Sequence, residues 1–244
     1  MKKYNGFYLM GNYPDKDTFI KAAVKGLEHF DFLEVGIPFS DPTADGDVIA
    51  DAAQALLDKN CTFNEISESI KEIRGKIPAE KDLYIMTYAN LIYNMDMPSF
   101  NTFCKETGVR GLILPDVPFC ERNYFAQLGL DEKIKLVNFM TPESTPEAIE
   151  EIAKISENFI YFISMRGITG TDFNLDEDTK SKIHFAISKS AVPVVTGFGI
   201  KTKDSADKAI EHSDGFIIGT ALIETLNKEG FDGYSTFVEN LFAQ

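Results

Sequence analysis

The sequence of 244 residues contains no tryptophan, only three cysteines and only three histidines. Cys61, Cys104 and Cys120 form no CxxC pair, and the histidines are scattered without the spacing of metal ligands. An odd number of isolated cysteines excludes a disulfide framework, and the missing ligand spacing argues against a zinc site. We therefore expect three reduced thiols in a cytoplasmic protein that binds no metal.

Long apolar runs and clusters of basic residues are missing as well. No stretch approaches the roughly 20 apolar residues that a membrane helix needs, and the first residues are too polar for a signal peptide. Acidic residues outnumber basic ones, with a formal net charge of −14. Because a nucleic-acid-binding surface is normally basic, we expect neither nucleic acid nor membrane as a partner. A phosphate ligand would meet a repulsive overall field, so local backbone dipoles would have to bind it.

Short apolar runs recur along the chain, in which 44% of the residues are hydrophobic. Runs of this kind, apolar at nearly every position, are typical of strands buried on both faces, which indicates a parallel sheet. We expect eight strands, at residues 7–10, 32–35, 83–87, 111–114, 135–139, 159–163, 193–196 and 215–218.

Helical patterns fall between these runs. They predict helices at residues 16–29, 48–58, 64–74, 99–107, 121–128, 145–156, 178–190, 204–212 and 221–228. Eight strands that are each followed by a helix indicate an α/β protein with a (β/α)8 fold, the TIM barrel, formed as a single domain over residues 1–244. An open doubly wound sheet is the alternative, and the absence of a GxGxxG turn disfavours it.

Acidic residues stand at the end of the second strand, and the active site of such a barrel lies at the carboxyl ends of its strands. If Glu34 points into the barrel, burial will raise its pKa, as a general acid/base requires; otherwise it faces outward or pairs with a lysine. The loop that follows is longer than an ordinary connection between strand and helix. Asp45 in this loop could accept a hydrogen bond from a substrate N–H group, and we expect Asp47 to cap the next helix.

Glycines follow each of the last three strands, in the segments 167–171, 197–199 and 219–220. Glycine lets backbone N–H groups approach an anion closely, and a helix N-terminus adds a favourable dipole. These segments therefore predict a phosphate site. Residues 169–178 hold several carboxylates and few apolar anchors, and we expect them to form a lid beside that site.

The segment 34–46, EVGIPFSDPTADG, resembles the signature of tryptophan synthase alpha subunits. The segments YAN at 88–90, PDVP at 115–118, GITG at 167–170, GFGI at 197–200 and GTA at 219–221 match the same family in the same order. The resemblance implies a lyase of tryptophan biosynthesis that cleaves indole-3-glycerol phosphate to indole and glyceraldehyde 3-phosphate without a cofactor of its own.

The resemblance also implies a role for each matching position. Glu34 corresponds to the general acid/base, Asp45 to the carboxylate that binds the indole N–H, and Tyr161 to a residue that orients the substrate. The phosphate binders would be Gly170, Gly199, Gly219 and Thr220. The indole pocket would comprise Tyr88, Thr169, Phe198 and Ile217.

The family's partner is the beta subunit, which carries pyridoxal phosphate, and the expected assembly is an alpha2beta2 heterotetramer. The matching interface positions are Pro38, Asp41, Asp116 and Pro118. Two alternatives remain open at this point: another phosphate-binding barrel, such as an epimerase or isomerase, and a non-catalytic activator of the beta subunit. The presence of both Glu34 and Asp45 disfavours the second.

Overall fold

The computed structural model describes residues 3–163, 175–197 and 199–243. Its strands form one parallel sheet in the order β5-β4-β3-β2-β1-β9-β8-β7-β6. The strands are β1 (Gly6–Met10), β2 (Phe32–Gly36), β3 (Asp82–Met86), β4 (Val109–Ile113), β5 (Lys135–Leu136), β6 (Asn138–Met140), β7 (Ile160–Ile163), β8 (Val194–Gly197) and β9 (Gly215–Ile218).

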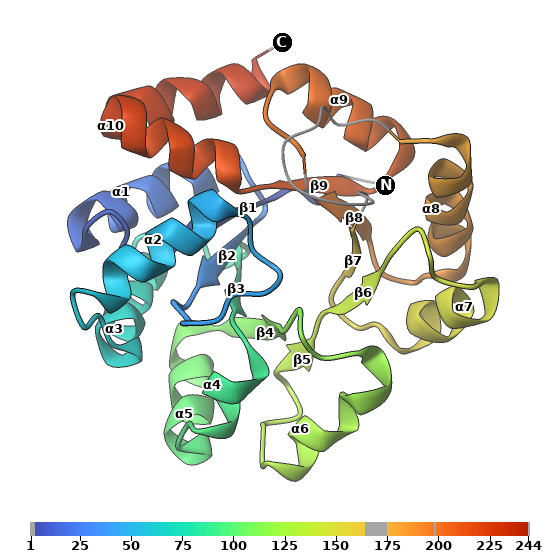
Figure 1. Cartoon of the computed structure of the whole chain (residues 1–244), viewed down its shortest axis with the longest axis horizontal. Coiled ribbons are helices and arrows are strands. Elements are labelled where there is room, and N and C mark those ends of the chain that lie inside the picture. Colours follow the sequence, from blue (N-terminus) through green and yellow to red (C-terminus); the bar gives the residue numbers. More distant parts are fainter. Residues whose placement is uncertain (1–2, 164–174, 198, 244) are drawn as a thin grey trace.

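The sheet closes on itself through the fifth expected strand. That strand is divided at Val137 into β5, which pairs with β4, and β6, which pairs with β7. Val137 itself donates its N–H to the carbonyl of Leu112 at 2.9 Å. The nine short strands are therefore the eight strands of a closed barrel, and the predicted (β/α)8 fold is confirmed (Figure 1). The prediction of one continuous strand over 135–139 is wrong, because its two halves bond to different neighbours.

Helices surround the barrel (Figure 1). They are α1 (Lys16–Leu27), α2 (Asp47–Leu57), α3 (Phe63–Arg74), α4 (Ala89–Tyr93), α5 (Met97–Thr107), α6 (Asn123–Gln127), α7 (Pro146–Ile155), α8 (Glu177–Lys189), α9 (Lys203–His212) and α10 (Thr220–Phe242). The sequence patterns missed α4 and the second half of α10. Gly230 is non-helical (φ 67°, ψ −164°), so the pattern breaks there although a helical segment continues on its far side.

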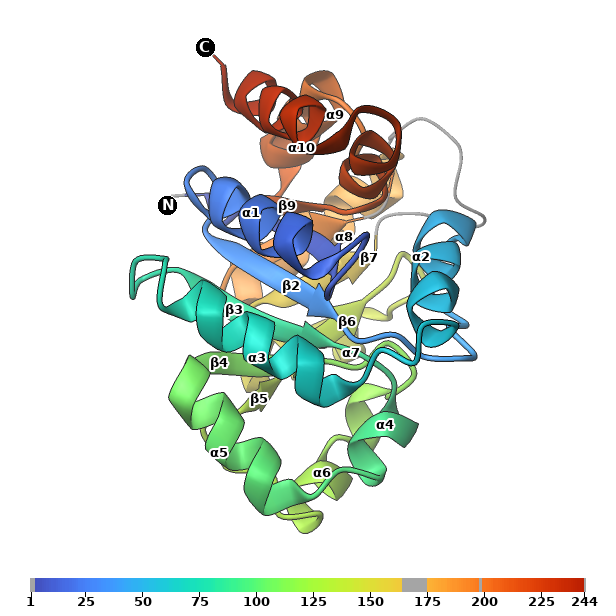
Figure 2. The same cartoon turned by 90° about the vertical axis from the view of Figure 1, so that its left-hand side faces the viewer.

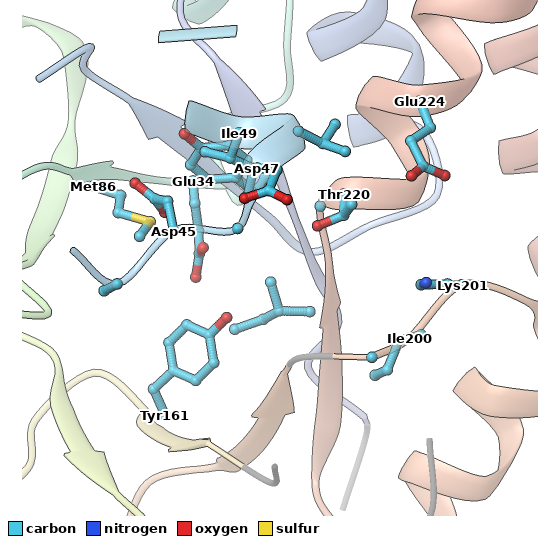
Figure 3. A pocket seen from close by; sticks show the side chains of 17 residues that line it. Glu34, Asp45, Asp47, Ile49, Met86, Tyr161, Ile200, Lys201, Thr220 and Glu224 are labelled. Atoms are coloured by element: carbon cyan, nitrogen blue, oxygen red, sulfur yellow. The ribbon is translucent and has the colours of Figure 1, made fainter. Parts of the chain in front are cut away.

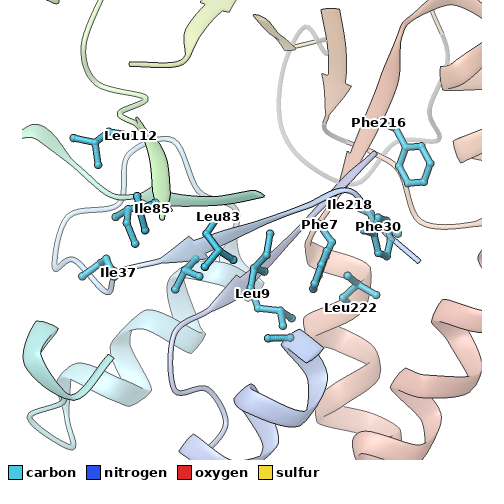
Figure 4. Packing of buried hydrophobic residues seen from close by; sticks show 14 of the residues in the cluster. Phe7, Leu9, Phe30, Ile37, Leu83, Ile85, Leu112, Phe216, Ile218 and Leu222 are labelled. Carbon is cyan, nitrogen blue, oxygen red and sulfur yellow. The ribbon is translucent and has the colours of Figure 1, made fainter. Parts of the chain in front are cut away.

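The alternation of side chains along the strands directs Glu34 into the barrel. In β2, Leu33 and Val35 belong to the apolar cluster that also includes Phe7 and Leu9 of β1, and this cluster lies between the strands and the helices (Figure 4). Phe32 belongs instead to the cluster inside the barrel. Because successive side chains of a strand point to opposite faces, Glu34 shares the inner face with Phe32.

Aromatic rings fill the amino-terminal end of the barrel. The ring of Tyr4 stacks on that of Phe32, with centroids 4.6 Å apart, and Phe159 contacts both rings. The Tyr4 hydroxyl donates to a carboxylate oxygen of Asp82 at 2.7 Å and lies 3.1 Å from the hydroxyl of Tyr84. This packed floor leaves the opposite, carboxyl end of the strands for a ligand.

Candidate active site

A cavity of about 270 Å³ lies at the carboxyl ends of the strands. Five segments that come together there supply most of its wall: the inner faces of β1 and β2, the loop that leads into α2, the loop after β8 and the start of α10 (Figure 3). The described residues that line it are Tyr8, Glu34, Ala44, Asp45, Gly46, Asp47, Val48, Ile49, Met86, Tyr161, Gly199, Ile200, Lys201, Ile217, Gly219, Thr220 and Glu224.

Glu34 is the most deeply placed ionisable group of this cavity. It is 1% exposed, and its register partners on either side are Tyr8 of β1 and Tyr84 of β3. Its Oε1 atom is buried without a hydrogen-bond partner among the described residues. Burial raises the pKa of Glu34 well above its ordinary value of 4.5, since the charged form would lose its hydration without compensation. The carboxyl therefore favours the protonated form and is able to donate a proton into the cavity.

Asp45 is held at the cavity by Tyr88. The Tyr88 hydroxyl donates to the Asp45 carboxylate at 3.0 Å and accepts the N–H of Ala44 at 3.0 Å, while its ring stacks on Phe39 with centroids 5.0 Å apart. Burial raises the pKa of Asp45 to about 6, although the hydrogen bond from Tyr88 opposes the shift. The loop thus carries a second carboxyl that is largely ionised at neutral pH and can accept a hydrogen bond or a proton.

The expected capping role of Asp47 is wrong. Gly46 is the N-cap of α2, with an extended backbone and no side-chain cap, and Asp47 is the first residue of the helix. A carboxylate is favourable there because it lies at the positive end of the helix dipole. The Asp47 side chain lines the cavity instead (Figure 3), and Figure 2 shows α2 beyond the arrowhead of β2.

Two glycines at strand ends make room for tyrosines inside the barrel. A Cβ atom at Gly36 would lie 2.0 Å from the Tyr8 hydroxyl, and one at Gly197 would lie 2.4 Å from the ring of Tyr161. Both tyrosines are buried and line the cavity, so Tyr161 lies at the same cavity as Glu34 and Asp45. Sequence reasoning missed Tyr8. Tyr8 faces inward because it pairs with Glu34 of β2. Every position of the first strand is buried, so the sequence pattern does not distinguish its inward face.

The predicted phosphate binders lie along one side of the same cavity. Gly199 has a positive φ of 79°, a conformation that favours glycine. Gly219 is the N-cap of α10, and Thr220 is its first residue. Because the first N–H groups of a helix have no acceptor within it, this end of α10 offers hydrogen-bond donors to an anion. The fourth predicted binder, Gly170, lies outside the described residues.

The predicted indole pocket is described only in part. Ile217 lines the cavity, whereas Tyr88 is buried and bound to Asp45. Thr169 and Phe198 lie outside the described residues, as does most of the lid expected over 169–178. At the end of that segment Asp176 caps α8 by accepting the N–H of Thr179 at 2.7 Å, so the helix begins one residue earlier than predicted.

The predicted interface positions differ in exposure. Asp41, Asp116 and Pro118 are exposed, whereas Pro38 is buried. Both carboxylate oxygens of Asp116 accept the N–H of Ala89, at 3.1 and 3.0 Å. Asp116 thereby fixes the start of α4, directly after the tyrosine that holds Asp45. Asp116 and Asp45 are therefore hydrogen-bonded to two adjacent residues, Ala89 and Tyr88.

Two further properties bear on the class of protein. Among the described residues no three His, Cys, Asp or Glu side chains are grouped so that they could hold a metal ion. Within the same part of the chain, no helix has both the length and the apolar character that crossing a membrane requires.

Fold and site together define a class: a (β/α)8-barrel enzyme whose cavity combines two carboxyl groups of raised pKa with glycines and the N-terminus of a helix. The sequence profile of one family, described as "Tryptophan synthase alpha chain", matches residues 4–242. The chain belongs to this family. The match excludes the epimerase- and isomerase-like alternatives.

Individual relatives agree with this assignment. The chain is 35% identical to the tryptophan synthase alpha chain of Christiangramia forsetii over 251 residues, covering 99% of this chain and 94% of that one. It is 37% identical to that of Leptospira biflexa over 224 residues, covering 91% and 83%. A solved chain from the tryptophan synthase α2β2 complex of Pyrococcus furiosus is similar in structure, with a TM-score of 0.85, 27% identity and 99% of each chain covered.

The buried Glu34 carboxyl should make stability depend on pH. Its pKa is raised in the folded state, so above about pH 4.5 the folded chain binds more protons than the unfolded chain, and stability falls as the pH rises toward the folded pKa. Gln cannot titrate. Relative to the wild type, Glu34→Gln should gain stability with rising pH, by up to about 1.4 kcal/mol per pH unit.

Urea unfolding at pH 5, 6, 7 and 8 measures this difference. The matched control is Glu80→Gln, at an exposed position between α3 and β3, for which the difference from the wild type should stay constant. Parallel stability curves for the wild type and Glu34→Gln would show that Glu34 is ionised in the folded protein.

Proposed function

We propose that the chain is the alpha subunit of a tryptophan synthase and cleaves indole-3-glycerol phosphate to indole and glyceraldehyde 3-phosphate. The observation that carries the proposal is the cavity itself. A buried Glu34 carboxyl, with no partner for its Oε1 atom among the described residues, faces the same space as Asp45 and a helix N-terminus suited to phosphate. The family match over residues 4–242 supports the same reaction.

Glu34 acts first as the acid and then as the base. Its proton moves to C3 of the indole ring, while the ring N–H gives up its proton on the side of Asp45. The Glu34 carboxylate then takes the proton of the adjacent glycerol hydroxyl. The carbon–carbon bond breaks, its electron pair enters the ring, and nitrogen regains a proton. A carboxyl whose pKa is raised by burial suits both steps, because it holds a proton that it can give to C3 and can take a proton once it is ionised.

Asp45 binds the indole N–H and must be ionised to do so. Its pKa of about 6 leaves it mostly ionised at neutral pH, and the hydrogen bond from Tyr88 fixes its orientation. Tyr161, buried in the same cavity as Glu34, orients the substrate. Ile217 contributes to the apolar wall against which the ring packs, together with Tyr88, Thr169 and Phe198 as pocket positions implied by the family.

The phosphate group lies at the start of α10. Gly170, Gly199, Gly219 and Thr220 supply N–H donors, as their correspondence to the family's binders implies. We assign the whole of residues 1–244 to one catalytic domain. The chain holds no cofactor of its own in this proposal, and it works in the cytoplasm.

The partner in this proposal is the tryptophan synthase beta subunit, in an alpha2beta2 assembly of the kind named for the Pyrococcus furiosus complex. Pyridoxal phosphate belongs to that subunit. Asp41, Asp116 and Pro118 are exposed near the cavity and can contact the partner, while the buried Pro38 shapes the loop behind them. Asp116 accepts the N–H of Ala89, which directly follows Tyr88. A partner that contacts Asp116 can therefore change the position of Tyr88 and, through its hydrogen bond, that of Asp45.

Replacement of the acid/base should abolish most cleavage. Glu34→Gln keeps the size of the side chain but cannot transfer the proton, so indole release should fall by roughly 10²–10⁴-fold. The assay is indole release from indole-3-glycerol phosphate, with and without the beta subunit, since a non-catalytic activator would release none in either case. Glu80→Gln is the control and should retain wild-type turnover. Wild-type turnover in Glu34→Gln would contradict the mechanism.

Replacement of Asp45 should separate chemistry from phosphate binding. Asp45→Asn should lower kcat/KM by about 10²-fold or more, while calorimetry with sn-glycerol 3-phosphate should give an unchanged Kd. In the wild type, log kcat/KM should fall as the pH drops through about 6, because protonated Asp45 no longer accepts the N–H proton. This acid limb should be missing from the residual activity of Asp45→Asn.

The matched control for this variant is Asp51→Asn, on the exposed face of α2. It should keep both the rate and the acid limb. Normal cleavage by Asp45→Asn, or an acid limb that persists in it, would assign the titration to another group.

A further inference from the structure

The charges around the cavity are strongly unequal. Four carboxyl-bearing side chains line it, and Lys201 is the only lysine or arginine among the described residues that do so. A phosphate monoester carries between one and two negative charges at neutral pH. It must therefore enter a cavity with several acidic neighbours in a chain of net charge −14. Backbone N–H groups carry only partial charges, so a full positive charge in this wall has a large relative effect.

The backbone of Lys201 is fixed in place. On one side Ile200 is buried, with 3% of its surface exposed. On the other side the Lys201 N–H donates to the Ser205 hydroxyl at 3.0 Å, and Thr202 and Ser205 form the capping box that begins α9. Lys201 follows the positive-φ Gly199 by two residues, so the side chain starts next to a predicted phosphate binder.

The ammonium group of Lys201 has no hydrogen-bond or ion-pair partner among the residues that the structure describes. Within the described ranges it takes part in no ion pair, whereas its neighbour Lys203 pairs with Asp207 at 3.4 Å. The acidic residue Glu224, which lines the cavity, lies 4.0 Å from a different lysine, Lys228. Figure 3 shows Lys201 on the side of the cavity where Thr220 and Glu224 lie, away from Asp45 and Met86. Lys201 therefore lies on the side of the cavity where α10 begins.

We propose that Lys201 is a phosphate-binding side chain of this enzyme. Its ammonium contacts the phosphate oxygens, adds a charged donor to the backbone donors of Gly199, Gly219 and Thr220, and offsets the repulsion from Asp47 and Glu224. Lys201 thereby determines specificity, because a substrate without the phosphate gains nothing from it. This inference rests on the proposed function, which supplies the phosphate-bearing substrate.

The test compares two lysines that lie two residues apart and carry the same charge. Lys201→Gln and Lys203→Gln each remove one positive charge, but only Lys201 lines the cavity. Calorimetry gives the Kd of sn-glycerol 3-phosphate for the wild type and each variant, at ionic strengths of about 10 and about 200 mM. Indole, which has no phosphate, serves as the second ligand, and indole release from indole-3-glycerol phosphate by each protein is measured in parallel.

Lys201→Gln should raise the Kd of glycerol 3-phosphate about tenfold at low ionic strength and less at high ionic strength, because salt screens the contact. Lys201→Arg should stay within about threefold of the wild type, and Lys203→Gln should leave the Kd unchanged. The affinity for indole should be the same in all four proteins, whereas a purely structural role of Lys201 would weaken it as well.

Equal effects of the two Lys→Gln changes, or no effect of Lys201→Gln, would overturn the assignment of Lys201. A wild-type chain that releases indole while Lys201→Gln keeps its KM contradicts only this inference. A wild-type chain that releases no indole, alone or with the beta subunit, contradicts the proposed function instead.

Discussion

The burial of the Glu34 carboxyl, whose Oε1 atom has no hydrogen-bond partner in the part of the chain that the structure describes, is the constraint on which the site depends. Glu34 is held in the middle of β2, bonded through its backbone to β1 and β3, so its side chain cannot turn away from the barrel interior. An ionised carboxylate without partners would be very unfavourable there, and the group keeps its proton instead. The packed rings of Tyr4, Phe32 and Phe159 below it keep that interior closed from the other end. Burial of this carboxyl lowers the free energy of unfolding, and it holds a proton at the position where the proposed reaction needs one.

The second carboxyl shows how the environment separates two roles. Asp45 is on a loop rather than a strand, and the hydrogen bond from the Tyr88 hydroxyl opposes the effect of burial, so its pKa is about 6. Burial alone raises the pKa of Glu34 well above its ordinary value. At a pH between the two pKa values, Glu34 retains its proton while Asp45 is ionised, an arrangement that acid/base enzymes commonly use. Tyr88 is the N-cap of α4, and the exposed Asp116 accepts the N–H of the next residue, Ala89, so hydrogen bonds to adjacent residues lead from Asp45 to an exposed carboxylate.

Much of this arrangement could be predicted from the sequence. The order of strands and helices followed from short apolar runs and helical periodicity, and Glu34 was recognisable as a carboxyl inside such a run. The resemblance singled out Asp45, Gly199 and Thr220, and the structure brings these positions to one cavity. These features are local in the chain, which is why local patterns and motifs reveal them.

The features that could not be predicted depend on long-range packing. Tyr8 lies in a strand buried at every position, so nothing local distinguishes its inward face, and only its pairing with Glu34 does so. The glycine at 197 reads as a possible anion binder, but its neighbour in space is the ring of Tyr161. The division of the fifth strand at Val137 follows from the separate pairing of its halves with β4 and β7. Asp47 and Lys201 face the cavity only because α2 and the loop after β8 reach the same end of the barrel.

The most direct test of this account is the titration of Glu34 itself. Carbon-13 labelling of the glutamate side chains, with Glu34→Gln to assign the signal, allows the Glu34 carboxyl to be followed by NMR as the pH of the free chain is raised. The account predicts a midpoint well above 4.5, with the carboxyl still protonated where exposed glutamates have already ionised. A midpoint at or below 4.5 would mean that Glu34 is charged in the folded barrel, and it would contradict the account.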